Sequence, residues 1–416
     1  MSVSFASRWG TRRLKWSVSK IGSGKTPSGG AEAYADYGVT FLRSQNIHFD
    51  GLRLDEVAYI DEATHRGMWG TRVMSGDVLL NITGASIGRV AYATSDLGRA
   101  NVNQHVCIVR PTSEFSTRYL AYALGSRPVQ EQIRELQVGG NREGLNFEQV
   151  GNLMIPAAHR DEQRRIADYL DTEVGKIDNL VAKKRHLVAL LNERIDSRVL
   201  QHVGASQLVN TESGFPALPI RRLLSKVSRP AVADVGVITA YRDGQVTERG
   251  ARRAEGYTLS ASIEPQGQHV QVGDVVVHGL DGFAGAIGTS EAEGNCSPVY
   301  HVCVPQGEGD ARFLGRLLRL LALQGYLGNF ATSTRERAVD FRNWDLFGRI
   351  PIPQVPPNEQ REIGEWISKV RPLREVIERS ASLAAERRQA LITATVTGQL
   401  DISTASGRNV SDGVPA

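Results

Sequence analysis

Apolar positions along this chain follow two different spacings. Short runs in which apolar residues are consecutive or alternate, divided by glycine-rich turns, predict β-strands at 78–82, 106–109, 275–277 and 299–304. Stretches in which apolar residues recur three and four apart predict helices at 117–129 and 311–323. The pattern therefore predicts units in which strands come first and a helix follows.

Two much longer stretches carry the apolar seam of a coiled-coil-like helix. The first runs without proline from Ile166 to Val199, and the second begins at Ile363. Pro372 interrupts the second, and we expect a kink or a loose turn there because proline removes a helical hydrogen bond. A lone helix would leave its seam exposed to water, so the two helices are expected to pack on each other, antiparallel.

The chain also contains an internal repeat with a shift of 197 residues. Three pairs of segments match at this shift: Gly76-Asp77-Val78 with Gly273-Asp274-Val275, Asn146-Phe147-Glu148 with Asn343-Trp344-Asp345, and Glu162-Gln163-Arg164 with Glu359-Gln360-Arg361. His105-Val106-Cys107 and His301-Val302-Cys303 match one residue out of register. The period is far longer than that of stacked repeats, which indicates a domain duplication.

These patterns predict an α+β fold, in which two pseudo-repeated mixed α/β domains are separated by two long antiparallel coiled-coil-like helices. The expected boundaries are 1–157 for the first domain, 158–204 for the first long helix, 205–354 for the second domain and 355–400 for the second long helix, with a flexible tail at 401–416. Two globular heads held apart by a helical rod would result.

Composition narrows the class of protein only slightly. Hydrophobic residues make up 41% and charged residues 23% of the 416 positions, as in soluble globular proteins. No apolar run reaches the roughly 18 residues of a membrane span, and the N-terminus has no apolar signal region. Three cysteines argue against a disulfide framework and for a reducing cytoplasm. The net charge of +4 does not by itself indicate a nucleic-acid partner.

Two motifs that suggest chemistry fail on closer inspection. Gly24-Lys25-Thr26 invites a phosphate-binding loop, and hence an NTPase, but Ser19 stands where that motif requires its first glycine. Pro27 follows at once, where such a loop should open a helix. The His-x-Cys pairs lack further ligands at zinc spacing, so we interpret them as residues of equivalent strands. The sequence also lacks a methyltransferase tetrad and a nuclease motif.

An Ile-Pro pair, a short spacer and Glu-Gln-x-x-Ile at the head of a long helix occur twice, at 155–166 and 352–363. This motif resembles that of specificity subunits of type I restriction-modification systems. The resemblance runs from about residue 11 to 400 and includes segments 21–28, 77–80, 83–88, 103–105, 142–147, 387–392 and 396–398. The second half departs from it at 226–230 and 279–285, in loops that differ between family members.

The resemblance implies a function without a catalytic centre in this chain. Each head would be a target recognition domain that reads half of a split double-stranded DNA sequence. The helices would set the unread spacer and bind two methyltransferase subunits, which use S-adenosylmethionine, while restriction subunits use ATP and Mg to translocate and cut. This chain would hold no cofactor and no metal, and would act in the cytoplasm in defence against phage, with no membrane partner.

Reading bases requires forked donors and acceptors on loops, and holding phosphates requires cations, hydroxyls and amides. The first half offers Lys25, Thr26, Ser28, Arg43, Ser44, Gln45, Asn46, Thr83, Ser86, Gln104 and Arg142. The second half offers Tyr241, Arg242, Arg249, Arg252, Arg253, His278, Arg335, Arg337 and Arg342. Any one of these could be an ordinary surface residue. The alternatives to a specificity subunit are a stand-alone sequence-specific DNA-binding protein and, less favoured, an enzyme built on Lys25.

Overall fold

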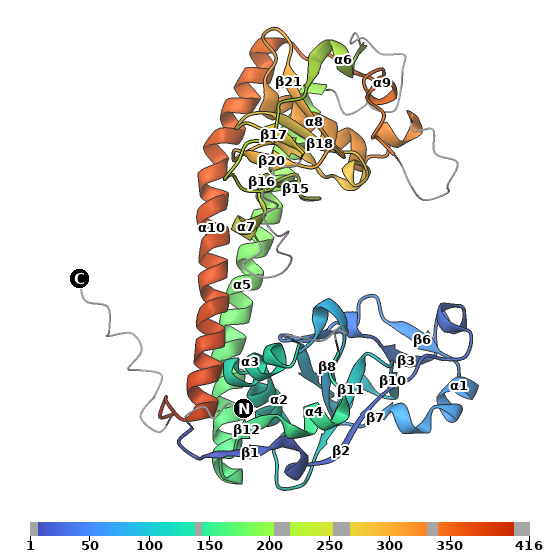
Figure 1. The fold of residues 1–416 in the computed structure, drawn as a ribbon, viewed down its shortest axis with the longest axis vertical. Helices are drawn as coiled ribbons and strands as arrows, with labels where there is room; N and C mark the ends of the chain where they lie inside the picture. Colours follow the sequence, from blue (N-terminus) through green and yellow to red (C-terminus); the bar gives the residue numbers. More distant parts are fainter. Residues whose placement is uncertain (1–6, 138–143, 204–216, 253–266, 331–339, 403–416) are drawn as a thin grey trace, which may run out of the picture. The chain divides into compact units, whose positions relative to one another are not determined.

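The computed structural model describes residues 7–137, 144–203, 217–252, 267–330 and 340–402. They divide into two compact units (Figure 1). Unit 1 comprises 1–184 and 379–416, and unit 2 comprises 185–378. Each unit therefore contains one head and a segment of each of two long helices, α5 (Arg160–Val203) and α10 (Pro357–Thr397).

Unit 1 is built on two four-stranded sheets. The first has the order β2-β11-β8-β9 and is antiparallel throughout, and the second, β6-β3-β10-β7, pairs β3 and β10 in parallel. The elements of this head are β1 (Thr11–Arg13), β2 (Val18–Ser23), β3 (Val39–Leu42), β4 (Ile47–His48), β5 (Gly51–Leu52), β6 (Ala58–Ile60), α1 (Glu62–Gly67), β7 (Arg72–Val73), β8 (Val78–Asn81), β9 (Val90–Tyr92), β10 (Ala100–Val102), β11 (Val106–Pro111), α2 (Thr117–Gly125), α3 (Arg127–Glu135), α4 (Phe147–Asn152) and β12 (Met154–Pro156).

The core of unit 1 joins the head to both long helices. Tyr119 and Leu124 of α2 are buried in the same cluster as Val174 of α5 and Ile392 and Val396 of α10. Burial of these apolar side chains, rather than helix propensity, is what holds α5 and α10 against the sheet.

Unit 2 repeats the arrangement with different loops. Its main sheet has the order β14-β21-β18-β19, the counterpart of β2-β11-β8-β9, which confirms the predicted duplication. Its elements are β13 (Ala217–Pro219), α6 (Ile220–Leu223), β14 (Leu224–Val227), β15 (Ile238–Ala240), β16 (Val246–Glu248), α7 (Arg249–Arg252), β17 (Gln268–Val270), β18 (Val275–His278), β19 (Ile287–Thr289), β20 (Gly294–Cys296), β21 (Tyr300–Pro305), α8 (Ala311–Leu323), α9 (Trp344–Phe347) and β22 (Pro351–Pro353).

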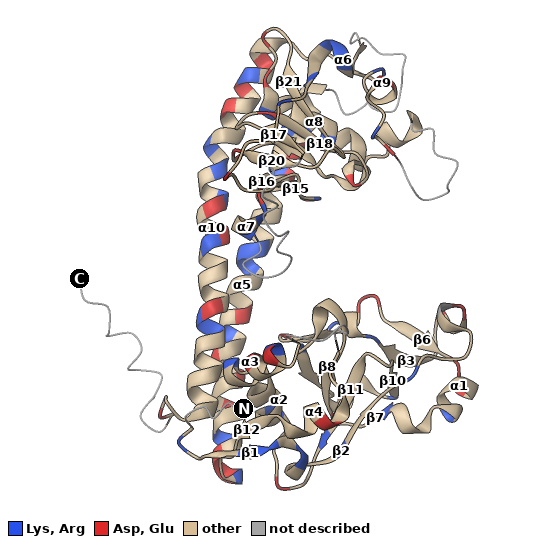
Figure 2. Ribbon diagram, viewed as in Figure 1, with Lys and Arg blue, Asp and Glu red and all other residues tan. Residues whose placement is uncertain are grey.

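Within each unit, the segments of α5 and α10 run antiparallel, as the apolar seams predict. In unit 1, Arg388 pairs with Asp178 at 2.8 Å, and Lys184 donates to Ser380. In unit 2, the Arg198 guanidinium lies 2.9 Å from Glu362. Along both helices Lys and Arg are interspersed with Asp and Glu (Figure 2), so neither helix carries a stripe of one sign.

One local prediction was wrong, and a second was wrong in part. The helix expected at 117–129 is two helices, because Ser126 takes extended dihedrals and Pro128 stands in the first turn of α3, where its missing N–H costs no hydrogen bond. Of the kink or loose turn expected at Pro372, the loose turn is absent, because α10 is helical throughout. The part of α10 that follows Pro372 is stabilised by the ion pair of Arg374 with Glu291 and by the buried Ile377.

Candidate nucleic-acid interface

In unit 1, four segments next to the ends of sheet strands or ahead of a helix are joined by backbone hydrogen bonds. Gly24 N–H donates to Asn103 C=O at 3.1 Å, and Ile82 N–H donates to His105 C=O at 3.0 Å. Leu145 N–H adds a bond of 2.7 Å to Ile82 C=O. We call residues 24–28, 82–86, 103–105 and 144–145 the first loop surface.

The first loop surface presents a connected row of polar side chains. Lys25, Thr26, Ser28 and Gln104 are exposed. Thr26 hydrogen-bonds Gln104, whose amide nitrogen lies 3.0 Å from His105 Nε2. His105 Nδ1 in turn lies 2.5 Å from Thr83 Oγ1. The sequence prediction did not include His105, because its pairing with Cys107 suggested a strand position.

The loop that follows β3 adjoins this surface through Asn81, whose amide donates to Ser44 C=O at 2.8 Å and to Ser86 Oγ at 3.0 Å. Gln45 is exposed, and the half-buried Arg43 lies over the Tyr34 ring at 5.4 Å.

Asn46 differs from its neighbours in that loop. Its side chain is buried, accepts from Arg43 N–H at 2.9 Å and donates to Arg53 C=O at 2.8 Å. Both ends of the Asn46 amide are thus occupied by backbone, and a base could not reach them, so we leave Asn46 out of the proposed interface.

Unit 2 has the counterpart surface. Gly279 N–H donates to Val299 C=O at 3.0 Å, and Phe341 N–H donates to Gly279 C=O at 2.8 Å, as Leu145 does to Ile82 in unit 1. We call residues 278–286, 297–301 and 340–342 the second loop surface. In both surfaces, the segment just before a short helix (α4 or α9) is therefore hydrogen-bonded next to the end of a sheet strand (β8 or β18).

His278 organises the turn of the second loop surface. Its Nδ1 accepts from Leu280 N–H at 3.1 Å and from Asp281 N–H at 2.9 Å, and its ring packs edge-on against Tyr300 at 4.5 Å. Burial lowers the pKa of His278. Since Nδ1 accepts two hydrogen bonds, the neutral ring carries its proton on Nε2.

Three arginines expected to contact DNA are paired with carboxylates. The pairs are Arg242 with Asp281 at 2.9 Å, Arg252 with Asp243 at 2.7 Å and Arg342 with Asp340 at 2.6 Å. Such pairing fixes the direction of each guanidinium fork and offsets its charge. The sequence prediction missed these acidic partners, although Asp243 and Asp340 are close to their arginines along the chain.

The other candidates of unit 2 either contact neighbouring side chains or, like Arg142 of unit 1, lie outside the described residues. Arg252 lies over the Tyr241 ring at 4.2 Å, and Arg249 Nε donates to Thr239 on β15 at 3.3 Å. Arg142, Arg253, Arg335 and Arg337 lie outside the described residues. Gly144, two residues after Arg142, forms a β-bridge with Thr83 on the first loop surface.

The glycine of the rejected phosphate loop has a structural role. A Cβ at Gly24 would lie 1.7 Å from Val102 C=O, so only glycine fits this close backbone approach. The next helical turn after Lys25 is a 3-10 turn at Gly30–Ala33, so no α-helix opens directly after this loop. Cys107 and Cys303 are core residues, and burial raises the pKa of each thiol to about 12. Across the described ranges, no three His, Cys, Asp or Glu side chains are grouped to hold a metal ion.

None of the helices in the described part of the chain is long and apolar enough to cross a membrane.

Residues 7–187 match the family model of the type I restriction modification DNA specificity domain. The chain is also similar to the HsdS subunit from Thermoanaerobacter tengcongensis (14% identity, 94% of this chain and 97% of that chain, TM-score 0.40). A second similar structure is the S subunit of a type I restriction-modification system from M. genitalium (16%, 95% and 98%, TM-score 0.42). A third comes from work on complex assembly and conformational transition of the type I R-M system (13%, 95% and 100%, TM-score 0.45). No curated protein matches the chain. The family match therefore identifies residues 7–187, which include the head of unit 1, as similar to the type I restriction modification DNA specificity domain.

Proposed function

We propose that this chain is the sequence-reading subunit of a type I restriction-modification complex and that it reads a bipartite DNA target. The two recognition domains would be 1–157 and 205–354. The observation that carries this proposal is the pair of equivalent loop surfaces, which differ in side chains while sharing their backbone frame. Two such surfaces, one in each head, suit a reader of two separate half-sites.

The two loop surfaces offer different chemistry. On the first, Gln104 supplies an amide suited to adenine, as does Gln45 on the adjoining loop after β3, while Lys25, Thr26 and Ser28 are suited to phosphates. On the second, the exposed Arg342 supplies a fork suited to guanine O6 and N7, aligned by Asp340. The exposed Arg242 and Arg252 lie outside that surface and offer two more forks, aligned by Asp281 and Asp243. The half-sites would therefore differ in sequence.

The helices 158–204 and 355–400 would set the spacer between the half-sites and bind the methyltransferase and restriction subunits. S-adenosylmethionine, ATP and Mg would belong to those partners, and the complex would act in the cytoplasm. Large apolar side chains are exposed along both helices, namely Leu180, Leu187 and Leu190 on α5 and Leu373, Val376 and Leu383 on α10.

A stand-alone sequence-specific DNA-binding protein is the second candidate. Such a protein would need no further binding surface, and contiguous exposed apolar side chains usually mark a place of protein contact. The exposed apolar residues of α5 and α10 therefore favour the specificity subunit.

The test is to co-express the chain with its methyltransferase subunits and to map methylated adenines across the host genome. A split motif with a fixed gap supports two reading domains, and exchange of residues 205–354 for those of another specificity subunit should then alter one half only. A continuous motif would contradict the proposal. Loss of methylation despite an assembled complex would contradict it as well.

A further inference from the structure

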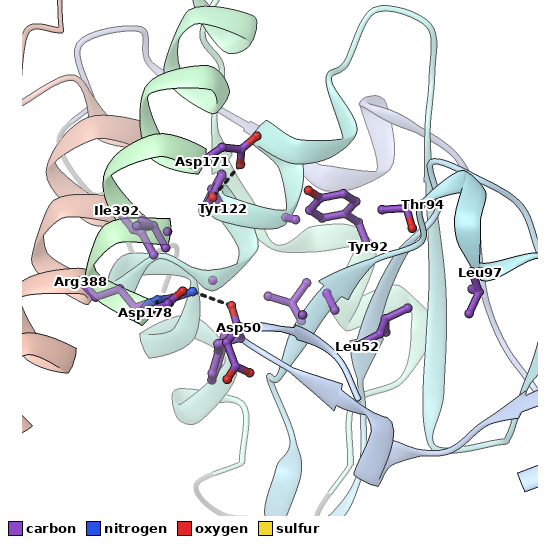
Figure 3. Close-up of a pocket in the computed structure, with 18 of the residues that line it drawn as sticks. Asp50, Leu52, Tyr92, Thr94, Leu97, Tyr122, Asp171, Asp178, Arg388 and Ile392 are labelled. Atoms are coloured by element: carbon purple, nitrogen blue, oxygen red, sulfur yellow. Dashed lines mark hydrogen bonds and ion pairs between the residues drawn. The ribbon is translucent and has the colours of Figure 1, made fainter. Parts of the chain in front are cut away.

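A pocket of about 530 Å³ lies in unit 1 where the head meets both long helices, and its polar groups are already used within the chain (Figure 3). Three of the carboxylates that line it are ion-paired: Asp178 with Arg388, Asp171 with Arg118, and Asp50 with Arg53. Groups paired with one another leave little net charge for a ligand, so the pocket does not point to an occupant. An exposed aromatic side chain elsewhere in the head, by contrast, has a large contact area that the fold does not use.

Trp69 presents this large apolar side chain at the surface of unit 1. It begins the 3-10 turn Trp69–Thr71, which lies between α1 and β7, and it is 78% exposed. An indole is among the largest contact areas that a side chain can bury, and its single polar atom is an N–H donor. Trp69 therefore offers a partner an apolar surface with almost no demand for hydrogen bonds.

The backbone on both sides of Trp69 is fixed from inside the head. The buried Asn101 amide nitrogen donates to Met68 C=O at 2.9 Å and to Thr71 Oγ1 at 2.7 Å. Met68 is 3% exposed and belongs to the same apolar cluster as Phe41. The flanking residues Met68 and Thr71 are thus held in the interior, and Trp69 supplies the one side chain between them. Because this turn is already ordered, a contact with Trp69 would cost little backbone entropy.

The turn lies at the same end of the second sheet of unit 1 as the candidate base readers. β7 pairs antiparallel with β10, with Arg72 opposite Asn101, so the residues just before β7 lie near the carboxyl end of β10. β10 in turn pairs in parallel with β3. Gln45 follows β3, Gln104 follows β10 and Trp69 precedes β7, so the three positions share one end of the sheet. Adjacent strands lie about 4.8 Å apart, which puts Trp69 within side-chain reach of the DNA that Gln104 would contact.

The turn is joined to the first loop surface and is flanked by cations. Lys25 Nζ donates to Gly67 C=O at 3.5 Å, and Lys20 Nζ donates to Gly70 C=O at 2.6 Å. Lys25 is exposed, and a carbonyl partner does not neutralise its charge. Positive charge beside an open aromatic ring favours a nucleic acid over an apolar protein surface, because the cation binds phosphate while the ring packs on a base edge. DNA is therefore the partner that this surface fits.

We propose that Trp69 recognises a thymine in the half-site that unit 1 would read, by packing against its C5-methyl group in the major groove. This inference rests on the proposed function. An A·T pair presents adenine N6 and N7 and the thymine methyl group along the same groove edge. Gln104 is suited to the adenine, so an apolar side chain one strand away suits the methyl group of the same pair or the next. The methyl group is the one apolar feature of that groove pattern, and the indole has no acceptor that would need a donor from a base.

The experiment is a double-mutant cycle between protein and DNA. The full chain, assembled with its methyltransferase subunits, is titrated against a duplex that carries the mapped split motif, and affinity is measured by fluorescence anisotropy. The half-site of unit 1 is the one that exchange of residues 205–354 leaves unaltered, and each of its thymines is replaced in turn by deoxyuridine, which removes the methyl group alone.

One replacement should weaken binding by the wild-type complex about fourfold, the value for one buried methyl group. Trp69→Ala should weaken binding to the unmodified duplex about tenfold, because the whole indole contact is lost. In the Trp69→Ala complex the same deoxyuridine should then have no further effect, since the two changes remove one shared contact.

Trp16→Ala is the matched control. Trp16 is 61% exposed and lies just before β2, whose other end leads into the first loop surface. Its replacement should leave both the affinity and the fourfold effect of deoxyuridine unchanged. Since both tryptophan side chains are exposed, the melting temperature of each variant should equal that of the wild-type chain.

The outcomes separate the two proposals. A fourfold loss that persists in the Trp69→Ala complex overturns the thymine contact, and so does the absence of any deoxyuridine effect in the wild-type complex, a result that needs no variant. Unchanged DNA affinity of Trp69→Ala together with weaker assembly with the methyltransferase subunits would assign Trp69 to a protein contact and overturn the inference as well. These results leave the split methylation motif, and thus the proposed function, standing. A continuous motif would overturn both.

Discussion

Gln163 and Gln360, one in the first turn of each long helix, make the same pair of hydrogen bonds in their own units. Gln163 donates to Ala158 C=O at 2.8 Å and accepts from Ser116 N–H at 2.8 Å. Gln360 donates to Val355 C=O at 2.7 Å and accepts from Asp310 N–H at 3.1 Å. Both side chains are buried. The repeated Glu-Gln motif thus ties the start of each long helix to the N-cap of α2 or α8.

Gln163→Leu should destabilise unit 1 by about 2 kcal/mol, because it leaves a buried N–H and a buried C=O without partners. The measurement is urea unfolding followed by circular dichroism. The neighbouring exposed Arg164→Gln should change the free energy of unfolding by less than about 0.5 kcal/mol. Equal stability of both variants would show that Gln163 does not act as a tie.

Gln45 and Asn46 are adjacent, and we expect opposite consequences of their replacement. Gln45→Ala should weaken binding to the cognate split site by about tenfold and leave stability unchanged, since its side chain is exposed. Asn46→Ala should cost about 1–3 kcal/mol of stability, because two backbone groups lose their partner. Fluorescence anisotropy with cognate duplex, together with thermal melting, separates the two effects. A stable Asn46→Ala chain with reduced affinity would restore Asn46 to the interface.

Asp340→Asn should release Arg342 and strengthen non-specific binding to duplex DNA at low salt. The plot of log affinity against log salt should become steeper by about 1, the slope expected for one further phosphate contact. Arg342→Gln in the same background should abolish the gain. An unchanged salt slope in Asp340→Asn would mean that the carboxylate does not restrain Arg342.

The same pair has a defined pH dependence. Hydrogen bonds from Arg342 lower the pKa of Asp340 below its ordinary value of 3.8. A carboxylate with a lowered pKa keeps its pair above that ordinary value and loses it only as the pH falls through the lowered one. Titration of Asp340 should therefore cause no step in DNA affinity between pH 5 and 8 in the wild-type chain, and Asp340→Asn should remove no step in that range.

The three cysteines should be inert in the folded chain. Burial raises the pKa of Cys107, Cys296 and Cys303 from 9.0 to about 12, so each remains a neutral thiol at pH 8. Ellman's reagent should react with none of them at pH 8 until denaturant is added, and then with all three. Because the unfolded thiols ionise first, stability should fall as the pH rises above about 9. Rapid reaction of one thiol in the native chain would contradict its burial.

The periodicity of apolar residues predicted the strands and the long helices, because these depend on which residues face a core. The matching segments 197 residues apart predicted the duplication. The helix 311–323 appears as expected, as α8 (Ala311–Leu323). The antiparallel pairing of α5 and α10 within each unit also follows from their apolar seams.

The details of the candidate interface depend on contacts that apolar periodicity does not encode. Asn46 has the chemistry of a base reader, yet the fold occupies its side chain with backbone. Arg242 has a partner, Asp281, that only the tertiary fold brings near. The pocket of unit 1 that is lined by Val90, Gly175 and Ile392 could likewise not be predicted from the sequence, because its walls come from segments far apart in the chain.

The mixed core of unit 1 has a consequence for the order of events during translation. Ile392 and Val396, which are buried against the N-terminal head, leave the ribosome after every residue of unit 2. Unit 2 ends at residue 378, so its synthesis is complete before that of unit 1, although its head follows the N-terminal head along the chain. Of the two heads, the one synthesised first is thus completed second. Premature termination between residues 379 and 391 would remove core residues from the N-terminal head and leave unit 2 whole.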